Sequence, residues 1–167
     1  MKRLLLLRHA KSSWDDPSLA DRDRPLAPRG HKAAERMAGH LRSSGPAVDL
    51  VLCSSALRTT ETLEHMGRAF GDAEVVVEDG LYGATDDQLL DRLRTVPEDV
   101  DGVALIGHNP GVQDLATGLA SAGEDLERMR TKFPTGAVAV LEFDGPWAGL
   151  AEGGGRLASF VAPKDLA

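Results

Sequence analysis

Short apolar runs alternate along the chain with segments in which apolar residues recur at helical spacing. The continuous runs over 4–7 and 103–106 are typical of buried strands, and two further strands are predicted over 50–53 and 75–77. The polar, proline-containing stretch from Ser12 to Pro28 indicates a loop. In the last third, two more strands are predicted over 137–143 and 157–161, joined by a glycine-rich connection as a β-hairpin.

Helices are predicted between these strands. Apolar residues at helical spacing place one helix over 29–44 and another between the second and third strands, ending at Gly71. We expect Ser55 to be the N-cap of the second of these helices. Thr85-Asp86-Asp87-Gln88 has the spacing of a capping box and begins a third helix, and Asn109-Pro110 is expected to supply the N-cap and first-turn proline of a fourth.

This alternation of strands and helices, followed by a terminal hairpin, predicts an α/β fold of one domain over 1–167. We expect a three-layer α/β/α sandwich with a mostly parallel central sheet and a C-terminal β-hairpin. In such sheets ligands bind beyond the carboxyl ends of the strands, so the residues directly after each strand are the first candidates for chemistry.

Composition narrows the class of protein. Of 167 residues, 42% are hydrophobic and 27% charged, which is typical of a globular domain. The single cysteine, Cys53, excludes a disulfide framework and favours a reducing compartment. The apolar run after Met1-Lys2-Arg3 ends at Arg8, too early for a signal peptide, and no other run is long enough for a membrane span. These features predict a cytoplasmic protein that does not associate with membranes.

The net charge of −7 argues against nucleic acid as a partner, but the charge is unevenly distributed. Residues 1–68 carry 12 basic and 8 acidic side chains, whereas residues 69–167 carry 7 and 18. The basic first segment can therefore still hold a small anion such as a phosphoryl group.

Four cationic or titratable residues follow three of the predicted strands. Arg8 and His9 come directly after the first strand, Arg58 lies just after the second, and His108 follows the strand over 103–106. Two arginines can bind phosphate oxygens through paired donors, and two histidines can act as nucleophile and as hydrogen-bond donor. Taken singly, each is explained as well by a surface arginine or a hydrogen-bonded histidine. Their joint placement at one sheet edge favours catalysis.

Helix electrostatics support this interpretation. Arg58 is expected in the first turn of its helix, where the helix dipole disfavours a cation, and His108 directly precedes the expected start of the fourth helix. A bound dianion would make the position of Arg58 favourable, because it would offset the repulsion between the guanidinium and the helix dipole. At His108, the helix N-terminus itself favours a bound anion. Locally unfavourable choices of this kind are typical of functional constraint.

The motifs resemble those of the histidine phosphatase superfamily, with its phosphoglycerate mutase-like fold, and in particular the short SixA-type phosphohistidine phosphatases. The segments that carry the resemblance are Leu6-Leu7-Arg8-His9-Ala10-Lys11-Ser12, Pro25-Leu26 with Gly30, Cys53-Ser54-Ser55-Ala56-Leu57-Arg58-Thr59-Thr60-Glu61-Thr62 and Gly107-His108-Asn109-Pro110-Gly111. They occur in the family's order and extend over nearly the whole chain.

The resemblance implies that His9 is the phosphate-accepting nucleophile, that Arg8 and Arg58 bind the phosphoryl oxygens, and that His108 completes the pocket. It also marks Ser12 and Lys11 as secondary phosphate contacts. The reaction would need no cofactor and no metal, and the chain contains no metal-ligand spacing of the His-Glu-x-x-His type.

Three positions depart from the family pattern. Ala10 replaces the usual glycine and is compatible with the fold provided that its φ is not positive. Ala27 stands where a threonine commonly caps the following helix. Asp15 falls where mutase-like members carry asparagine, and a carboxylate there would repel a phosphate unless it points away or is protonated.

The substrate is constrained by the general acid. Release of an alkoxide from a phosphate ester needs a proton donor, and the candidates are Glu78, Asp79 and Asp15. SixA-type proteins resemble this chain in lacking a clear acid. A phosphohistidine substrate depends less on a general acid, because its protonated imidazole leaves easily. We therefore expect a phosphohistidine-bearing protein as substrate, with a small phosphate ester as the alternative.

Three other classes of protein share some of these features. A non-catalytic phosphate-binding regulatory module would keep the same four residues without turnover. A cysteine phosphatase is disfavoured because four residues, not five, separate Cys53 from Arg58, and because Cys53 ends an apolar strand, as a buried structural thiol would. A dinucleotide-binding fold is disfavoured because no G-x-G-x-x-G follows a strand.

Overall fold

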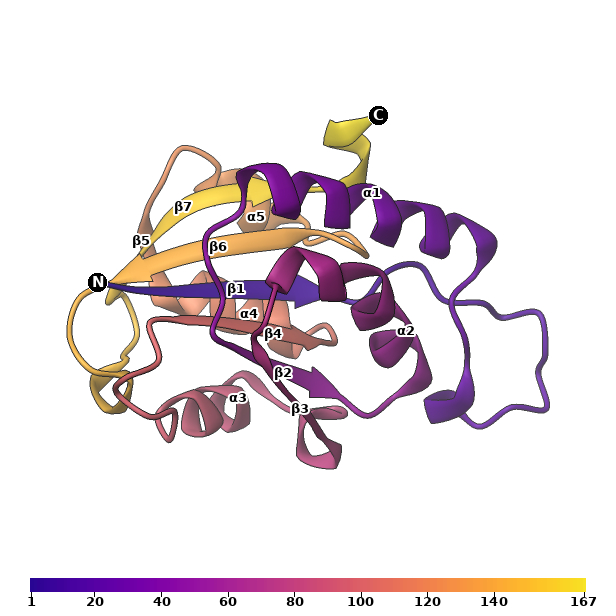
Figure 1. Cartoon of the computed structure of the whole chain (residues 1–167), viewed down its shortest axis with the longest axis horizontal. Coiled ribbons are helices and arrows are strands. Elements are labelled where there is room, and N and C mark those ends of the chain that lie inside the picture. Colours follow the sequence, from indigo (N-terminus) through magenta and orange to yellow (C-terminus); the bar gives the residue numbers. More distant parts are fainter.

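A seven-stranded mixed sheet forms the centre of the molecule, which is described over residues 1–167 by a computed structural model (Figure 1). The strand order is β3-β2-β4-β1-β6-β7-β5. The strands are β1 (Lys2–Arg8), β2 (Leu50–Ser54), β3 (Glu74–Glu78), β4 (Gly102–Gly107), β5 (Ala120–Ala122), β6 (Val138–Phe143) and β7 (Gly155–Val161). β3, β2, β4 and β1 are parallel neighbours, and β6 and β7 form an antiparallel hairpin, so both of these predictions are confirmed.

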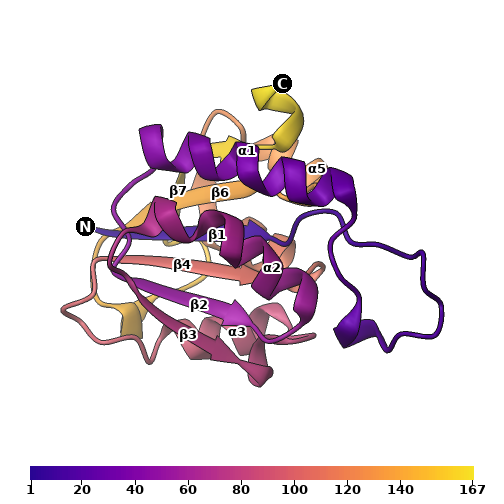
Figure 2. The ribbon, with the colours of Figure 1, turned by 45° about the vertical axis from the view of Figure 1, so that its right-hand side comes forward.

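Helices cover both faces of this sheet. α1 and α2 lie on one face, and α3, α4 and α5 on the other, which confirms the three-layer sandwich (Figure 2). The helices are α1 (Pro28–Ser44), α2 (Leu57–Met66), α3 (Asp86–Leu93), α4 (Gly111–Leu119) and α5 (Leu126–Thr131). None of them combines the length and hydrophobicity that a membrane span requires.

β1 shows why continuous apolar runs predicted the strands correctly. Leu4 and Leu6 belong to a core of 27 residues shared with α3, α4 and α5, whereas Leu5 and Leu7 belong to a core of 17 residues shared with α1 and α2. Successive side chains of a strand point to opposite faces, so a strand covered on both sides must be apolar at every position. All four leucines are at most 1% exposed.

Two helix starts were predicted wrongly. The N-cap of α2 is Ala56, not Ser55, whose hydroxyl instead accepts a hydrogen bond from Arg22 at 2.6 Å. The N-cap of α4 is Pro110, one residue after the predicted Asn109, and the Asn109-Pro110 peptide is cis. Asn109 still caps the helix from outside, because its Oδ1 accepts a hydrogen bond from the Gln113 backbone N–H at 3.2 Å.

Two short elements were not predicted at all. β5 pairs with β7 at the sheet edge, and α5 follows it. The six residues of α5 bury one side chain, Met129, so its sequence has no apolar repeat from which a helix could be inferred.

The carboxyl ends of the parallel strands meet at one edge of the sheet. Arg8 at the end of β1 is in register with Gly107 at the end of β4, and Ser54 at the end of β2 is in register with Glu78 at the end of β3. The connection from β1 to α1, over 9–27, extends beyond this edge as a long loop with one short 3-10 turn (Figure 2). The predicted loop there is confirmed, and it begins at the sheet edge where ligands bind in such folds.

Candidate active site

The structure brings together the four residues expected to perform chemistry. Arg8 ends β1, His9 follows it, Arg58 lies in the first turn of α2, and His108 directly follows β4. The ring centroids of His9 and His108 are 5.3 Å apart. The positive charges of Arg8 and Arg58 act on both rings and help to lower their pKa values. Two imidazoles and two guanidinium groups therefore form one electropositive cluster at the sheet edge, which we call the catalytic pocket.

His9 is fixed in the tautomer that a nucleophile needs. Its Nδ1 lies 2.7 Å from the carbonyl oxygen of Ala10, and since a carbonyl can only accept, Nδ1 carries the proton. The lone pair then resides on Nε2. Burial, with the nearby positive charges, lowers the pKa of His9 to about 3 although the bond to Ala10 opposes this shift. The ring is therefore neutral near pH 7.

In His108 the bonded and free ring nitrogens are the reverse of those in His9. Its Nε2 is 2.8 Å from the hydroxyl of Ser54, while its buried Nδ1 has no hydrogen-bond partner. Burial, followed by the charge of Arg58, lowers the pKa of His108 to about 4. If the Ser54 hydroxyl donates to Nε2, Nδ1 carries a proton with nothing to receive it. An unpaired buried donor of this kind is unfavourable in isolation and suits an anionic ligand.

The two arginines differ in how far they are already engaged. Arg8 donates through Nη1 to the carbonyl oxygen of Phe133 at 2.9 Å, and its buried Nε has no partner. Arg58 donates through Nη1 to the backbone oxygen of Asp21 at 2.7 Å and through Nη2 to the Asp21 carboxylate at 3.0 Å. Each guanidinium has five N–H groups, so both retain donors for further oxygen atoms.

Asp21 is a residue of this site that sequence reasoning missed. Its carboxylate accepts hydrogen bonds from the hydroxyl of Tyr82, from Arg58 and from Arg24. These donors, Tyr82 foremost, hold the pKa of Asp21 well below its usual range, so the group remains a carboxylate. Asp21 lies in the long loop after β1, between the motif that ends at Ser12 and the one that begins at Pro25, and nothing in its local sequence signals this role.

Ser54 was also missed, and here a signal existed. It is the last residue of β2, the strand that precedes Arg58, and it is fully buried. A polar residue at the carboxyl end of a buried parallel strand lies at the edge where ligands bind. The same argument that selected Arg8 and His108 would have selected Ser54.

The backbone beneath the nucleophile is closely packed. The N–H of Ala10 donates to the hydroxyl of Thr62 in α2 at 3.1 Å, and Ala10 has no positive φ, so its replacement of the family's glycine is compatible with the fold. Gly30 is required in α1, because a Cβ there would lie 2.0 Å from the carbonyl oxygen of Lys11. Ala27, the N-cap of α1, makes no side-chain capping bond, as expected for an alanine.

The two residues predicted as secondary phosphate contacts lie outside the group of four. Ser12 is buried, and its hydroxyl accepts a hydrogen bond from Arg24. Lys11 is exposed, and its side chain lines a neighbouring groove with α1. Both flank the pocket through the loop that follows His9.

The candidates for a general acid have other partners or face solvent. Both carboxylate oxygens of Glu78 accept hydrogen bonds from Nε of Arg92 in α3, at 2.7 and 2.9 Å. Asp79 is exposed and pairs with Arg22 at 3.0 Å, and Asp15 is exposed in the loop after β1. The carboxylate that does lie in the pocket, Asp21, is held in its charged form.

Cys53 lies in the core beside α1 and α2, as a structural thiol should. It is fully buried, and its Sγ donates to the carbonyl oxygen of Ser54 at 3.3 Å. Burial raises the pKa of Cys53 to about 12, which leaves it protonated and unreactive near neutral pH. The interpretation against a cysteine phosphatase is thereby supported.

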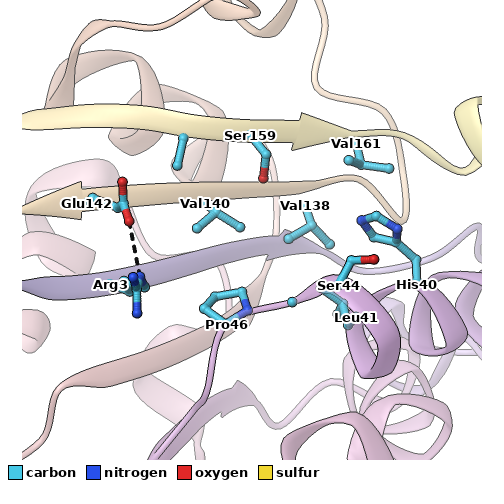
Figure 3. A pocket seen from close by; sticks show the side chains of 12 residues that line it. Arg3, His40, Leu41, Ser44, Pro46, Val138, Val140, Glu142, Ser159 and Val161 are labelled. Atoms are coloured by element: carbon cyan, nitrogen blue, oxygen red, sulfur yellow. Dashed lines mark hydrogen bonds and ion pairs between the residues drawn. The ribbon is translucent and has the colours of Figure 1, made fainter.

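A second recess of about 340 Å³ lies on the face of the sheet beside the C-terminal end of α1 (Figure 3). Valines of β6 and β7 line it, and its charged residues Arg3 and Glu142 pair with each other at 3.1 Å. No group of three or more His, Cys, Asp and Glu side chains in the structure is placed to hold a metal ion.

Comparison with known proteins agrees with this geometry. The model of the histidine phosphatase superfamily, branch 1, matches residues 4–84, and an uncharacterised protein of Mycobacterium tuberculosis is 42% identical over 162 residues, covering 95% of this chain and 100% of that protein. The structure of a candidate phosphohistidine phosphatase SixA from Nakamurella multipartitia superposes with a TM-score of 0.86 at 35% identity, covering 97% of this chain and 96% of the other. The chain belongs to the histidine phosphatase superfamily.

Within this superfamily the chain is of the SixA type. A second SixA candidate, from Agrobacterium tumefaciens, superposes with a TM-score of 0.82 at 34% identity, covering 97% of this chain and 98% of the other. The resemblance seen in the motifs is confirmed, as is the phosphoglycerate mutase-like α/β fold that it implied. The chain is accordingly a phosphatase of the histidine phosphatase superfamily.

Proposed function

We propose that this histidine phosphatase removes the phosphoryl group from phosphohistidine in a protein, through a covalent phosphohistidine on His9, without a metal. The observation that carries the proposal is the state of His9: Nδ1 donates to the Ala10 carbonyl, the ring is neutral near pH 7, and the positive charges of Arg58 and Arg8 act on it. A neutral imidazole with its lone pair directed into an electropositive pocket is an activated nucleophile for phosphoryl transfer.

The transfer proceeds in two in-line steps. In the first, His9 Nε2 forms a bond to phosphorus while the bond from phosphorus to the substrate's imidazole nitrogen breaks, and that imidazole leaves carrying the proton on its other nitrogen. In the second, water attacks phosphorus, the bond to Nε2 breaks, and inorganic phosphate leaves. Arg8, Arg58 and the Nδ1–H of His108 neutralise charge on the equatorial oxygens in both steps.

Phosphohistidine suits this pocket better than a phosphate ester does. An ester releases an alkoxide that needs a proton from a general acid. The carboxylate within the pocket, Asp21, is held charged by Tyr82, Arg58 and Arg24, while Glu78 is paired with Arg92. Transfer between two imidazoles needs no strong acid, because the bond formed resembles the bond broken. The related SixA candidates are themselves described as phosphohistidine phosphatases, which supports the same substrate class.

A substrate panel tests the proposal. Phosphate release is measured from phosphohistidine, phosphoserine and phosphotyrosine peptides and from 3-phosphoglycerate, with His9→Ala as the blank and His40→Ala, remote from the pocket, as the matched control. We expect phosphohistidine to give the highest kcat/KM, His9→Ala to lose activity and His40→Ala to keep it. Faster release from phosphoglycerate than from phosphohistidine would assign the enzyme to small esters instead.

Trapping the intermediate tests the mechanism separately. Enzyme mixed with substrate and denatured at alkaline pH, where phosphohistidine survives, should carry one phosphoryl group on the peptide that contains His9, detected by mass spectrometry. Binding of phosphate without any labelled enzyme would indicate a non-catalytic phosphate-binding module.

A further inference from the structure

A strongly basic groove of about 470 Å³ lies beside the catalytic pocket, between the start of α1, the loop after α5 and the C-terminal 3-10 turn. Eleven residues line it, of which six are basic and none is acidic. We call this surface the basic groove, and its cations are Lys11, Arg29, Lys32, Arg36, Lys132 and Lys164. Such a concentration is unexpected in a chain with a net charge of −7.

The cations of the basic groove are not used to stabilise the fold. None of the six makes an ion pair within 4.0 Å, although ten other basic side chains of the chain do. The nearest acidic neighbour in sequence to Lys164 is Asp165, which pairs with Arg128 at 2.8 Å. Lys11, Arg29, Lys32 and Arg36 are all exposed, so their charges face solvent without an ion-pair partner.

Helix electrostatics make this arrangement less favourable still. Arg29 and Lys32 lie near the N-terminus of α1, whose first turn contains no acidic residue and whose N-cap, Ala27, makes no capping bond. The N-terminal end of a helix carries a partial positive charge, so cations there repel it. Arg29, Lys32 and Arg36 are spaced so that they share one face of the helix, and they also repel each other. A negatively charged ligand in the groove would relieve both effects.

One loop forms a wall of both the basic groove and the catalytic pocket. The carbonyl oxygen of Phe133 accepts a hydrogen bond from Arg8 at 2.9 Å, while its neighbours Lys132 and Pro134 line the groove. The N–H of Gly136 donates to the backbone oxygens of Arg8 and His9 at 3.0 and 2.9 Å. Lys11 is two residues after the nucleophile. A ligand whose phosphoryl group reaches His9 therefore extends naturally over the groove.

We propose that the basic groove docks an acidic face of the phosphorylated protein substrate, next to the phosphohistidine that enters the catalytic pocket. This inference rests on the proposed function. Continuity with the pocket favours the substrate itself over a separate ligand, because both anionic parts then belong to one molecule. The cations come from four segments of the chain and surround an open recess, which matches several carboxylates spread over a protein surface. Complementary charge of this kind mainly accelerates association and sets specificity.

The test uses three phosphohistidine peptides that differ in their flanking residues: four glutamates, four glutamines or four lysines. We expect kcat/KM at low ionic strength to be about 10-fold higher for the glutamate peptide than for the lysine peptide. The difference should arise in KM, and it should shrink at about 0.3 M salt because exposed charges are screened.

A charge-matched pair of variants assigns this preference to the groove. Lys32→Gln/Arg36→Gln removes two cations of the groove at exposed helical positions where glutamine is well tolerated. Arg42→Gln/Arg68→Gln removes two exposed, unpaired cations elsewhere. The first variant should reduce the ratio of kcat/KM between glutamate and lysine peptides by about 5-fold, and the second should leave it unchanged. Circular dichroism confirms that both variants fold.

Each other outcome overturns the proposal in a distinct way. Equal kcat/KM for the three peptides, or an equal change in both variants, shows that the groove does not select substrate. Inhibition by tripolyphosphate but not by a glutamate octapeptide indicates a small polyanion site, and binding to phosphatidylserine vesicles without any peptide preference indicates a membrane surface. Failure to hydrolyse any of the phosphohistidine peptides, while p-nitrophenyl phosphate is hydrolysed, overturns the proposed function itself and the docking surface with it.

Discussion

β1 has an arginine near each end, and the two arginines differ in whether the protein satisfies their hydrogen-bond donors. Arg3, near the start of the strand, pairs with Glu142 at 3.1 Å, in the recess beside the C-terminal end of α1 (Figure 3). Arg8, at the end, has a buried Nε without a partner. A charge that is satisfied within the protein contributes to the fold, whereas a buried charge that is left with free donors is available to a ligand. The functional end of the sheet is the end where the protein's own pairing is incomplete.

Removing each arginine in turn gives the largest expected contrast. Arg8→Gln should lower kcat/KM by about 10²- to 10³-fold, because it removes a charged donor aimed at oxygens that gain charge in the transition state. Arg3→Gln should change kcat/KM less than about 2-fold, and Glu142 would keep its pair with Arg156. The measurement is steady-state phosphate release from a phosphohistidine peptide. Similar losses in both variants would mean that Arg8 acts through the fold.

Two variants of His108 test which of its ring nitrogens contacts the phosphoryl group. Asparagine can place an N–H where Nδ1 lies, whereas glutamine places one where Nε2 lies. We expect His108→Gln, which keeps a group near Ser54, to lose about 100-fold in kcat, and His108→Asn to lose about 10-fold. Steady-state kinetics of the two variants decide this, and the reverse order would assign the phosphoryl contact to Nε2.

Acid should weaken the fold through the catalytic end of the molecule. Burial lowers the pKa of His9 to about 3 and of His108 to about 4, whereas histidine in an unfolded chain titrates near about 6.5. Between about pH 4 and 6.5 the unfolded chain therefore binds more protons than the folded one. Stability present above this window is lost as the pH falls, by about 1.4 kcal/mol per pH unit for each histidine.

Urea unfolding at several pH values across this window measures the slope. His108→Gln should flatten it, since one of the two titrating groups is then removed. An unchanged slope in that variant would show that other groups control the acid sensitivity.

The smallest effect is expected at Cys53, which lies in the core rather than at the edge. Cys53→Ser should leave kcat/KM within about 2-fold of the parent and lower stability by about 1 kcal/mol, because a hydroxyl replaces a buried thiol but can still donate to Ser54. Phosphate release and urea unfolding measure the two effects. A loss of activity comparable with that of His9→Ala would revive a cysteine-based mechanism.

The sequence predicted the parts of the fold that depend on repeating patterns. Runs such as Leu4–Leu7 and Val103–Ile106 are apolar at every position because helices cover both faces, and that signal is unambiguous. The bounds of helices depended on single residues, and these were less reliable: Asn109 caps α4 from one position outside its predicted place. α5 buries Met129 alone, which no periodicity can reveal.

In the candidate site, too, residues that follow strands were easier to predict than residues in loops. Arg8, His9, Arg58 and His108 were predicted as one group because they directly follow strands or begin a helix, and the sheet topology does bring these positions together. Asp21 was not predicted, because the position of a loop residue depends on all the contacts that the loop makes. These include the hydrogen bonds of Arg24 with Ser12 and Ser13. The basic groove escaped attention because its cations come from segments more than 150 residues apart in sequence.

The carboxylate of Asp21 has a consequence for turnover. In this structure it accepts a hydrogen bond from Nη2 of Arg58, and the Asp21 backbone oxygen accepts one from Nη1. When inorganic phosphate departs, Arg58 is not left exposed and unpaired, because Asp21 is available to take the place of the leaving anion. The loop after β1 thus carries an internal competitor of the product. We expect such a competitor to weaken inhibition of the enzyme by free phosphate.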